Sequence, residues 1–221
     1  MARGRGDDDV VVVGLGSFGV AVATELTSLG NRVTVLERQR ERAERLGRGF
    51  HRVIVADASD PATLEEAHAP EAASAVVAIG SSVEASVLTA ANLVDLGVRS
   101  IWAKASSPRH ARILERLGVH KVIFPEAESG RRVAHLLDGR MLDYIEFDDG
   151  FAVVKMRPPS ELIGFTLGES RVRSKYGVTV VGVKRSAEAF TYATPETKVT
   201  NRHEILVSGP VKLIERLANR P

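Results

Sequence analysis

Three glycines near the amino end of the chain have the spacing of a phosphate-binding turn. The run Val10–Val13 is typical of a buried strand, and Gly14, Gly16 and Gly19 follow it directly in G-x-G-x-x-G order. In this pattern the first glycine permits a tight turn, the second lets a diphosphate approach the backbone, and the third lets the next helix pack on the sheet. The N–H groups at the start of that helix, with the helix dipole, form an anion site.

An acid lies where the ribose of a bound nucleotide would be expected. The second predicted strand, Arg32–Leu36, ends at Glu37, whose carboxylate would accept hydrogen bonds from both ribose hydroxyls and repel a 2′-phosphate. The glycine pattern alone is weak evidence, but with a strand before it, a helix after it and this acid it predicts a bound adenine nucleotide. The alternative is a glycine-rich turn without a ligand, with Glu37 as a surface carboxylate paired with Arg40 or Arg42.

The elements that must position these residues alternate between strand and helix as far as residue 138. Strands are predicted at 10–13, 32–36, 52–56, 75–79, 100–104 and 121–124, and helical patterns separate them. This alternation is typical of a parallel sheet with helices on both faces. We therefore predict a doubly wound, six-stranded Rossmann-type α/β domain over residues 1–138, with its ligand at the carboxyl ends of the strands.

From residue 139 the pattern changes to strands separated by turns. Strands are predicted at 144–147, 151–156, 178–184 and 204–208, with a hairpin turn at 148–150 and a terminal helix after Pro210. We interpret residues 139–221 as a second, smaller α+β domain.

Composition excludes several classes of protein. The 221 residues include 30 basic and 28 acidic side chains and no cysteine, so the chain has neither a disulfide framework nor a thiolate metal site, which fits a cytoplasmic location. No basic stripe indicates a nucleic-acid partner, and the six histidines lack metal-ligand spacing. The tail 1–9 does not have the apolar stretch of a secretory signal, and no apolar run is long enough to cross a bilayer.

Five segments carry a family resemblance. They are GLGSFG at 14–19, AIGSSVEAS at 78–86, SIWAKA at 100–105, HARILERLGVHKVIFPE at 110–126 and YGVTVVGVKR at 176–185. In order and at the expected spacing, they span nearly the entire chain, and the second and fourth are much more specific than the glycine motif. Through them the sequence resembles the regulatory subunits of bacterial Trk/Ktr potassium uptake systems, which are built from RCK (regulator of potassium conductance) domains.

The resemblance implies a nucleotide-binding RCK domain followed by a C-terminal RCK domain that binds a small regulatory ligand. It implies homodimers that assemble into a ring, an octamer, which docks on a separate membrane-embedded potassium pore subunit and gates it. On this hypothesis the chain is a cytosolic nucleotide-sensing gating subunit and not an enzyme, and its partner holds it peripherally at the inner face of the cell membrane.

One residue departs from the family pattern. In the Ktr branch the residue after the second glycine is usually an arginine that reaches toward the terminal phosphate of ATP, and here it is Ser17. A serine hydroxyl can donate one hydrogen bond but has neither the charge nor the fork geometry of a guanidinium. The cofactor is therefore expected to be an adenine nucleotide, either ATP and ADP or, more readily than in the Ktr branch, NAD and NADH.

The predicted nucleotide contacts lie in the glycine turn and at the carboxyl ends of the strands. They are Gly14, Leu15, Gly16, Ser17, Phe18, Gly19, Glu37, Arg38, Asp57, Ala58, Ile79, Gly80, Ser81, Lys104 and Glu126. A helix cap is the alternative for Asp57, and a surface position is the alternative for Lys104. Glu126 matches a family position that can hold Mg²⁺ or Ca²⁺ bridging to nucleotide phosphate, because a carboxylate beside phosphate needs such a cation; otherwise it is an acid in the first turn of a helix.

In the C-terminal domain the resemblance points to a second ligand site. Val172, Arg173, Thr179 and Pro195 fall where related chains bind cyclic di-AMP across a dimer interface. Arg173 could pair with phosphate, although the run Ser170–Arg173 could equally be an exposed turn.

Two other functions remain open at this point. The first is a small NAD-dependent oxidoreductase, although residues 139–221 are poor in convergent His, Lys and Tyr side chains for proton transfer. The second is a regulatory subunit of a potassium or cation/proton antiporter, which the same family resemblance allows.

Overall fold

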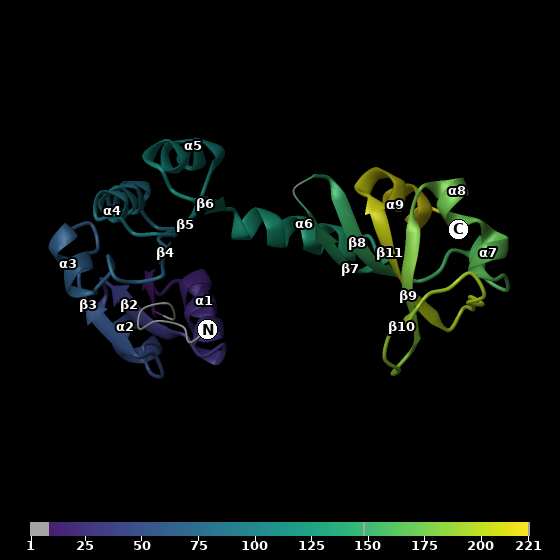
Figure 1. The fold of residues 1–221 in the computed structure, drawn as a ribbon, viewed down its shortest axis with the longest axis horizontal. Helices are drawn as coiled ribbons and strands as arrows, with labels where there is room; N and C mark the ends of the chain where they lie inside the picture. The colour runs from purple at the N-terminus through teal and green to yellow at the C-terminus, as the bar shows by residue number, and fades with distance from the viewer. Residues whose placement is uncertain (1–8, 148, 221) are drawn as a thin grey trace. The chain divides into compact units, whose positions relative to one another are not determined.

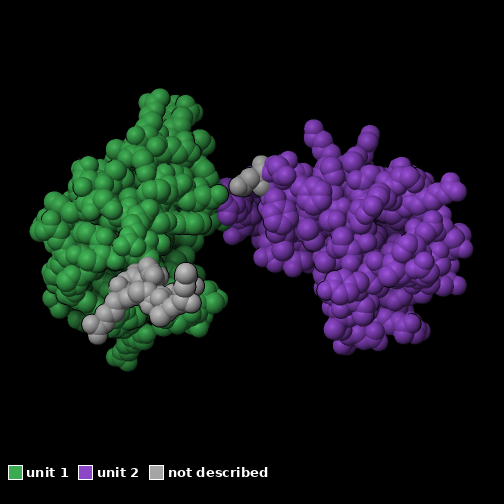
Figure 2. Space-filling model, in the orientation of Figure 1, with its two compact units in different colours: residues 1–125 green, residues 126–221 purple. Residues whose placement is uncertain are grey.

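The computed structural model describes residues 9–147 and 149–220. Residues 1–8 of the N-terminal tail and Asp148 of the predicted hairpin turn lie outside this range. The chain divides into two compact units, Met1–Pro125 and Glu126–Pro221, which Figure 2 colours separately. No helix among the described residues has both the length and the apolar character needed to cross a membrane.

The first unit is built on a six-stranded parallel sheet (Figure 1). Its strands are β1 (Asp9–Val13), β2 (Arg32–Glu37), β3 (Arg52–Val55), β4 (Ser74–Val77), β5 (Ile101–Lys104) and β6 (Lys121–Ile123), in the spatial order β3-β2-β1-β4-β5-β6. All neighbouring strands run parallel, which confirms the predicted Rossmann-type sheet. The strand order reverses between β1 and β4, and a sheet of this kind binds ligands at the carboxyl ends of the strands beside that reversal.

Helices cover both faces of this sheet because the residues of β1 alternate between two cores. Val10 and Val12 belong to one apolar cluster with Ala23 of α1, whereas Val11 and Val13 belong to another that covers the opposite face. Helices α1 (Ser17–Ser28) and α2 (Arg40–Leu46) contribute to the first cluster, and α3 (Pro61–Glu66), α4 (Val83–Asp95) and α5 (Pro108–Leu117) contribute to the second.

Side-chain caps set where three of these helices begin. Asp60 accepts a hydrogen bond from the Ala62 amide at 3.0 Å, Ser82 from the Ala85 amide at 3.1 Å, and Ser107 from the His110 amide at 3.2 Å. Each cap fixes the turn that leaves a strand of the sheet. The carboxyl ends of β3, β4 and β5 are therefore well-defined edges on which a ligand site can be built.

The second unit combines several helices with a five-stranded antiparallel sheet. Helix α6 (Pro125–Leu137) precedes β7 (Met141–Glu146), β8 (Phe151–Met156), η1 (Ser160–Leu162), α7 (Leu167–Ser170), α8 (Val172–Tyr176), β9 (Thr179–Arg185), β10 (Thr191–Tyr192), β11 (His203–Pro210) and α9 (Val211–Ala218). The spatial order is β10-β9-β11-β8-β7, and Ile214 and Leu217 of α9 lie in the apolar cluster of this unit. The predicted smaller α+β domain is confirmed.

The boundaries and one strand differ from the sequence prediction. β7 begins at Met141, three residues before the predicted strand, and the pairing with β8 shifts register between Met141 and Asp143, which interrupts the alternation of apolar and polar residues. β10 has only two residues, both exposed, so no pattern predicted it. The predicted domain boundary at 138–139 lies within the second unit and stays a prediction.

Candidate functional site

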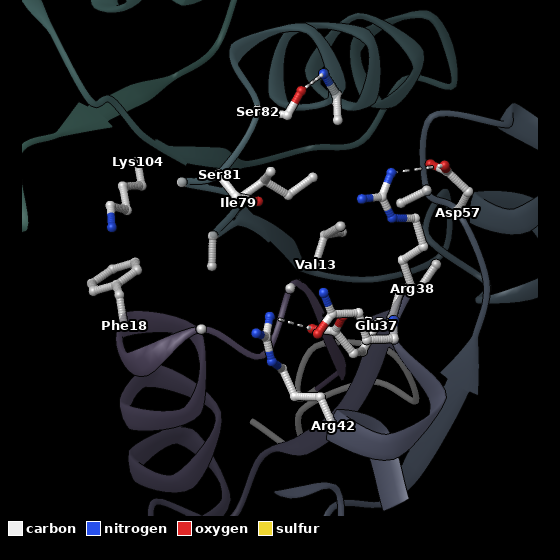
Figure 3. A pocket seen from close by; sticks show the side chains of 18 of the residues that line it. Val13, Phe18, Glu37, Arg38, Arg42, Asp57, Ile79, Ser81, Ser82 and Lys104 are labelled. Atoms are coloured by element: carbon white, nitrogen blue, oxygen red, sulfur yellow. Dashed lines mark hydrogen bonds and ion pairs between the residues drawn. The ribbon is translucent and has the colours of Figure 1, made fainter.

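A crevice opens at the carboxyl ends of the strands in the first unit (Figure 3). It contains about 890 Å³ of empty space, part of it open to solvent. Its lining consists of Val13, Gly14, Gly16, Ser17, Phe18, Leu36, Glu37, Arg38, Gln39, Arg42, Ala56, Asp57, Ala58, Ala78, Ile79, Gly80, Ser81, Ser82, Ala85 and Lys104. All the predicted nucleotide contacts except Leu15, Gly19 and Glu126 are therefore brought together on one surface.

The glycine turn has the geometry that a bound diphosphate requires. Gly14 has φ +98°, a left-handed conformation that favours glycine, and its amide donates to the Leu36 carbonyl at 2.8 Å. A Cβ on Gly19 would collide with the Gly14 carbonyl oxygen, so Gly19 sets how closely α1 approaches the turn. A Cβ on Gly16 would meet nothing within 4 Å. Gly16 therefore leaves open space on the crevice side, whereas Gly14 and Gly19 are needed by the fold itself.

The amino end of α1 supplies positive charge to this space. Gly16 is the N-cap and has no side chain that could satisfy the first amides of the helix. Those amides and the positive end of the helix dipole are a ready site for a phosphate group. Leu15 contributes to the turn in another way, because its side chain is buried in the core and its amide bonds to Glu37.

Glu37 fastens the glycine turn to the end of β2. Its side chain is only 5% exposed, and its two oxygens accept the Leu15 and Gln39 amides, each at 2.8 Å. The Arg42 guanidinium lies 3.9 Å from Oε2. Glu37 is thus buried rather than a surface carboxylate, although Arg42 is its ion-pair partner. Each carboxylate oxygen has two lone pairs, so both can still accept one ribose hydroxyl.

The wall beyond β3 carries the next predicted contacts. Asp57 accepts hydrogen bonds from the amide and the hydroxyl of Ser59 at 3.0 and 2.7 Å, and Arg38 reaches its other oxygen at 3.9 Å (Figure 3). The Ser59 hydrogen bonds, with a smaller contribution from Arg38, lower the pKa of Asp57. Asp60, not Asp57, caps α3. The Asp57 carboxylate is therefore held ionised at the crevice wall.

Lys104 and Phe18 lie at the opposite side of the crevice from Arg38 and Asp57 (Figure 3). A Cβ on Gly80 would come within 3.1 Å of the Lys104 ammonium nitrogen. The missing side chain of Gly80 therefore leaves the room that the ammonium occupies, and Lys104 is half-buried. Its position suits the phosphate or distal end of a ligand that also reaches Glu37.

Several lining residues were not predicted from sequence. Arg42 and Gln39 come from the start of α2, Ser82 and Ala85 from the start of α4, and Val13, Leu36, Ala56 and Ala78 from strand ends. The signal for Arg42 was its place one turn into the helix that follows Glu37. In the sequence Arg42 was considered only as a possible ion-pair partner of Glu37.

The second unit contains a separate hollow with about 940 Å³ of empty space, part of it open to solvent. Val172, Arg173, Thr179 and Pro195 all line it, together with Leu167, Gly168, Arg171, Ser174, Val178, Val180, Ala193 and Thr194. Arg173 donates from Nε to the Thr179 hydroxyl at 3.1 Å. The four predicted residues are therefore neighbours around a space large enough for a small ligand, and Arg171 and Arg173 both belong to its lining.

The predicted metal ligand is less defined. Glu126 is exposed and lies in the first turn of α6, in the second unit. No group of three or more His, Asp or Glu side chains within the described residues is arranged to hold a metal ion. A single carboxylate that bridges through a cation to phosphate would not form such a group, so the role of Glu126 stays a prediction.

Two family models match the chain. The model of the TrkA-N domain matches residues 10–125, and that of the TrkA-C domain matches residues 151–220. The Ktr system potassium uptake protein A of Vibrio alginolyticus is 32% identical over 216 residues, which cover 97% of each chain. The Ktr system potassium uptake protein C of Bacillus subtilis strain 168 is 29% identical over 214 residues, which cover 96% of each chain.

Solved structures share the fold. The RCK domain of GsuK has a TM-score of 0.64 and 19% identity, and a GsuK channel bound to NAD has a TM-score of 0.66 and 18% identity. Both matches cover 96% of this chain, but this chain spans only 48% and 39% of those chains.

Proposed function

Because this chain belongs to the Trk/Ktr family of RCK potassium uptake regulatory proteins, we propose that it is a nucleotide-sensing gating subunit of a potassium channel or transporter. The observation that carries the proposal is the crevice. It combines an open phosphate cradle at Gly16, a buried acceptor at Glu37 and a cation at Lys104 on one surface. These are the three chemical groups that an adenine nucleotide needs for its phosphates and its ribose.

The ligand has its adenosine part near Glu37, Arg38 and Asp57 and its phosphates at the start of α1. Glu37 accepts the ribose hydroxyls, and its charge excludes a 2′-phosphate. With serine at position 17, no guanidinium extends from the glycine turn to select a third phosphate. NAD and NADH, or ADP, therefore suit this crevice as well as ATP does. The similar GsuK channel binds NAD, which supports this choice.

A divalent cation would bind together with the nucleotide. Glu126 would hold Mg²⁺ or Ca²⁺ against a phosphate, since a carboxylate and a phosphate repel each other without a cation between them. The protein then needs the metal for phosphate-rich ligands such as ATP and much less for NAD.

The hollow of the second unit would bind a second regulatory ligand. Arg171 and Arg173 supply positive charge, and Val172, Val178 and Pro195 supply apolar surface. A compact anionic nucleotide such as cyclic di-AMP fits this combination.

The nucleotide acts by changing the balance between two conformations of an assembly. Homodimers would form a ring, an octamer, on the cytoplasmic face of a membrane-embedded potassium pore subunit. A ligand shifts such a ring only if it binds the two conformations with different affinities. The relevant pair is therefore ATP and ADP or NADH and NAD, whose members differ in charge or shape at the end of the ligand near Lys104.

Catalysis is not part of this proposal. A dehydrogenase presents a proton-transfer group to its substrate beside the nicotinamide. The described lining of the crevice includes no histidine or tyrosine, and we assign its one lysine, Lys104, to the ligand's phosphates. When the protein is mixed with NAD and each of a panel of alcohols and hydroxy acids, the nicotinamide absorbance should therefore stay constant.

The direct test is equilibrium binding of ATP, ADP, NAD and NADH to the purified protein, followed by potassium flux through the pore subunit in liposomes. We expect at least one nucleotide of each pair to bind and the two members to give different fluxes. Lys104→Ala should reduce this difference, and Lys121→Ala, on the exposed part of β6, serves as the matched control. Absence of nucleotide binding, or equal flux with every nucleotide, would contradict the proposal. Flux of protons or sodium instead of potassium would point to an antiporter.

A further inference from the structure

A buried histidine holds the turn that follows Lys104. The side chain of His110, in the first turn of α5, is 2% exposed. Its Nδ1 accepts a hydrogen bond from the Ser106 amide at 3.3 Å, and the Ser106 hydroxyl lies at the same distance. Ser106 follows Lys104 by two residues, at the sheet edge where the crevice opens. The imidazole therefore fastens the first turn of α5 to the end of β5.

The protonation state of this histidine follows from its partner. A backbone N–H can only donate, so Nδ1 must be the unprotonated, accepting nitrogen and the proton must be on Nε2. Within the described residues Nε2 is buried without a hydrogen-bond partner. A second proton on Nδ1 would point at the Ser106 amide and break this bond. The Ser106 hydroxyl could reverse its role and accept, but the amide could not.

Among the described residues, the elements next to His110 carry no buried carboxylate that would stabilise its charged form. The charged residues of α4, α5, β5 and β6, the elements next to it, are Glu84, Asp95, Lys104, Arg109, Arg112, Glu115, Arg116 and Lys121. Lys104 is half-buried and the others are exposed. Ser86 and Thr89 are the buried polar residues of α4, and both are uncharged. Burial accordingly lowers the pKa of His110.

The place of Lys104 is sensitive to small movements of this turn. The Ala105 amide holds the strand end to the Ile123 carbonyl at 2.9 Å, and the Ser106 amide is the next contact along the chain. The Lys104 ammonium occupies the space that a Cβ on Gly80 would enter, with 3.1 Å between them. A shift of the turn by a fraction of that distance would move the ammonium relative to a bound phosphate.

We propose that His110 is a positioning residue for the nucleotide crevice and that its protonation, by releasing the Ser106 amide, weakens nucleotide binding. This inference rests on the proposed nucleotide site. Protonation of His110 would make the gating subunit respond to acidification through the same crevice that binds the nucleotide. A bound nucleotide holds Lys104 in place and therefore favours the neutral form of His110, which keeps the turn closed. The affinity for nucleotide is then constant at neutral pH and falls as His110 takes up a proton.

The chain offers a matched control at the other end of β5. His120 accepts the Ile101 amide on Nδ1 at 3.1 Å, the same pairing of amide and ring nitrogen as at His110. It is exposed, however, and lies at the amino end of the strand, the sheet edge away from the crevice. Asparagine places an acceptor oxygen close to the position of Nδ1 and does not titrate. His110→Asn should therefore keep the turn closed at every pH, and His120→Asn should leave the crevice unchanged.

The experiment measures ADP and NAD affinity by calorimetry at pH 7.5, 6.5 and 5.5 for the wild type and both variants. NAD has no phosphate monoester and does not titrate in this range, and titration of ADP itself affects all three proteins alike. One linked proton can weaken binding by up to about tenfold per pH unit below the pKa of His110, and we expect the wild type and His120→Asn to lose more affinity on acidification than His110→Asn. Equal losses in all three proteins overturn the inference and leave the proposed function standing. Failure of both nucleotides to bind at pH 7.5 overturns both.

A second readout uses the nucleotide-free wild type and does not depend on how the variants fold. The Ser106 amide should lose protection from hydrogen exchange as the His110 ring takes up a proton, with the two changes at one midpoint by nuclear magnetic resonance. A Ser106 amide that stays protected after His110 is protonated would refute the positioning role.

Discussion

Replacing Gly16 with alanine separates the phosphate cradle from the fold. Gly16 has φ −67°, which alanine adopts without strain, and a Cβ there meets no atom within 4 Å. Alanine reduces the conformational freedom of the unfolded chain, which stabilises the folded protein by about 0.4–1 kcal/mol. Alanine is also a poorer N-cap than glycine, which destabilises the folded protein by a similar amount. The free energy of unfolding of the nucleotide-free protein should therefore remain within about 1 kcal/mol of the wild type.

The same methyl group would stand where a phosphate approaches the amides at the start of α1. Loss of one charge-assisted hydrogen bond costs about 1.5–3 kcal/mol, so Kd should rise roughly ten- to 150-fold. At a ligand concentration 100 times the wild-type Kd, the nucleotide stabilises the wild type by about 2.7 kcal/mol and the variant by about 1.4 kcal/mol or less. Denaturant unfolding with and without ADP or NAD measures both quantities.

Gly19→Ala is the matched control variant for Gly16→Ala. Its methyl would collide with the Gly14 carbonyl, so this variant should lose about 1–3 kcal/mol of stability before any ligand is added. If Gly16→Ala bound nucleotide with wild-type affinity, the phosphates would not lie on this turn and the reasoning would be refuted.

Other residues give three further predictions. Glu37→Gln should destabilise the nucleotide-free protein by about 1–3 kcal/mol in urea unfolding, because a carboxamide cannot accept both the Leu15 and the Gln39 amides; unchanged stability would contradict the clamp. Lys104→Ala should weaken the binding of ADP more than that of adenosine, and this difference in affinity should shrink as salt is added. Equal losses of affinity for the two ligands would show that Lys104 does not contact the phosphates. The Lys155 and Lys184 ammonium groups, 3.0 and 3.3 Å from Glu204, lower the pKa of that carboxyl, with the Lys155 hydrogen bond the larger cause. Because this pKa is lower in the folded than in the unfolded protein, the Glu204 carboxylate stabilises the fold above the unfolded pKa of about 4.3, and this contribution is lost as pH falls through the folded pKa. Glu204→Gln should therefore make the free energy of unfolding depend less on pH below about pH 4.3, which circular dichroism would detect.

The first half of the fold could be predicted because its signals are local. The run Val10–Val13 is apolar on both faces, as a central parallel strand must be, and the glycines after it have spacing that few other structures need. The crevice then follows from topology, since strand ends of a parallel sheet share one edge. This is why residues as distant in sequence as Gly16, Asp57 and Lys104 could be predicted to meet.

What could not be predicted depends on contacts between distant elements. The histidines have no metal-ligand spacing in the sequence, and only the packing of α5 shows that His110 is buried against Ser106. Glu37 was predicted as a ribose acceptor, but its two internal amide bonds depend on the exact meeting of the glycine turn with β2. The short strand β10 forms because β9 offers an edge, and its own residues carry no alternation.

We propose that the crevice at the carboxyl ends of β1 and β4 is an adenine nucleotide site, and a crystal structure of the protein grown with NAD or ADP would show whether it is. We expect the diphosphate over Gly16 at the start of α1, the ribose hydroxyls on Glu37 and the Lys104 ammonium at the end of the ligand away from Asp57. A nucleotide bound elsewhere, or a crevice closed by its own side chains at saturating nucleotide, would contradict it.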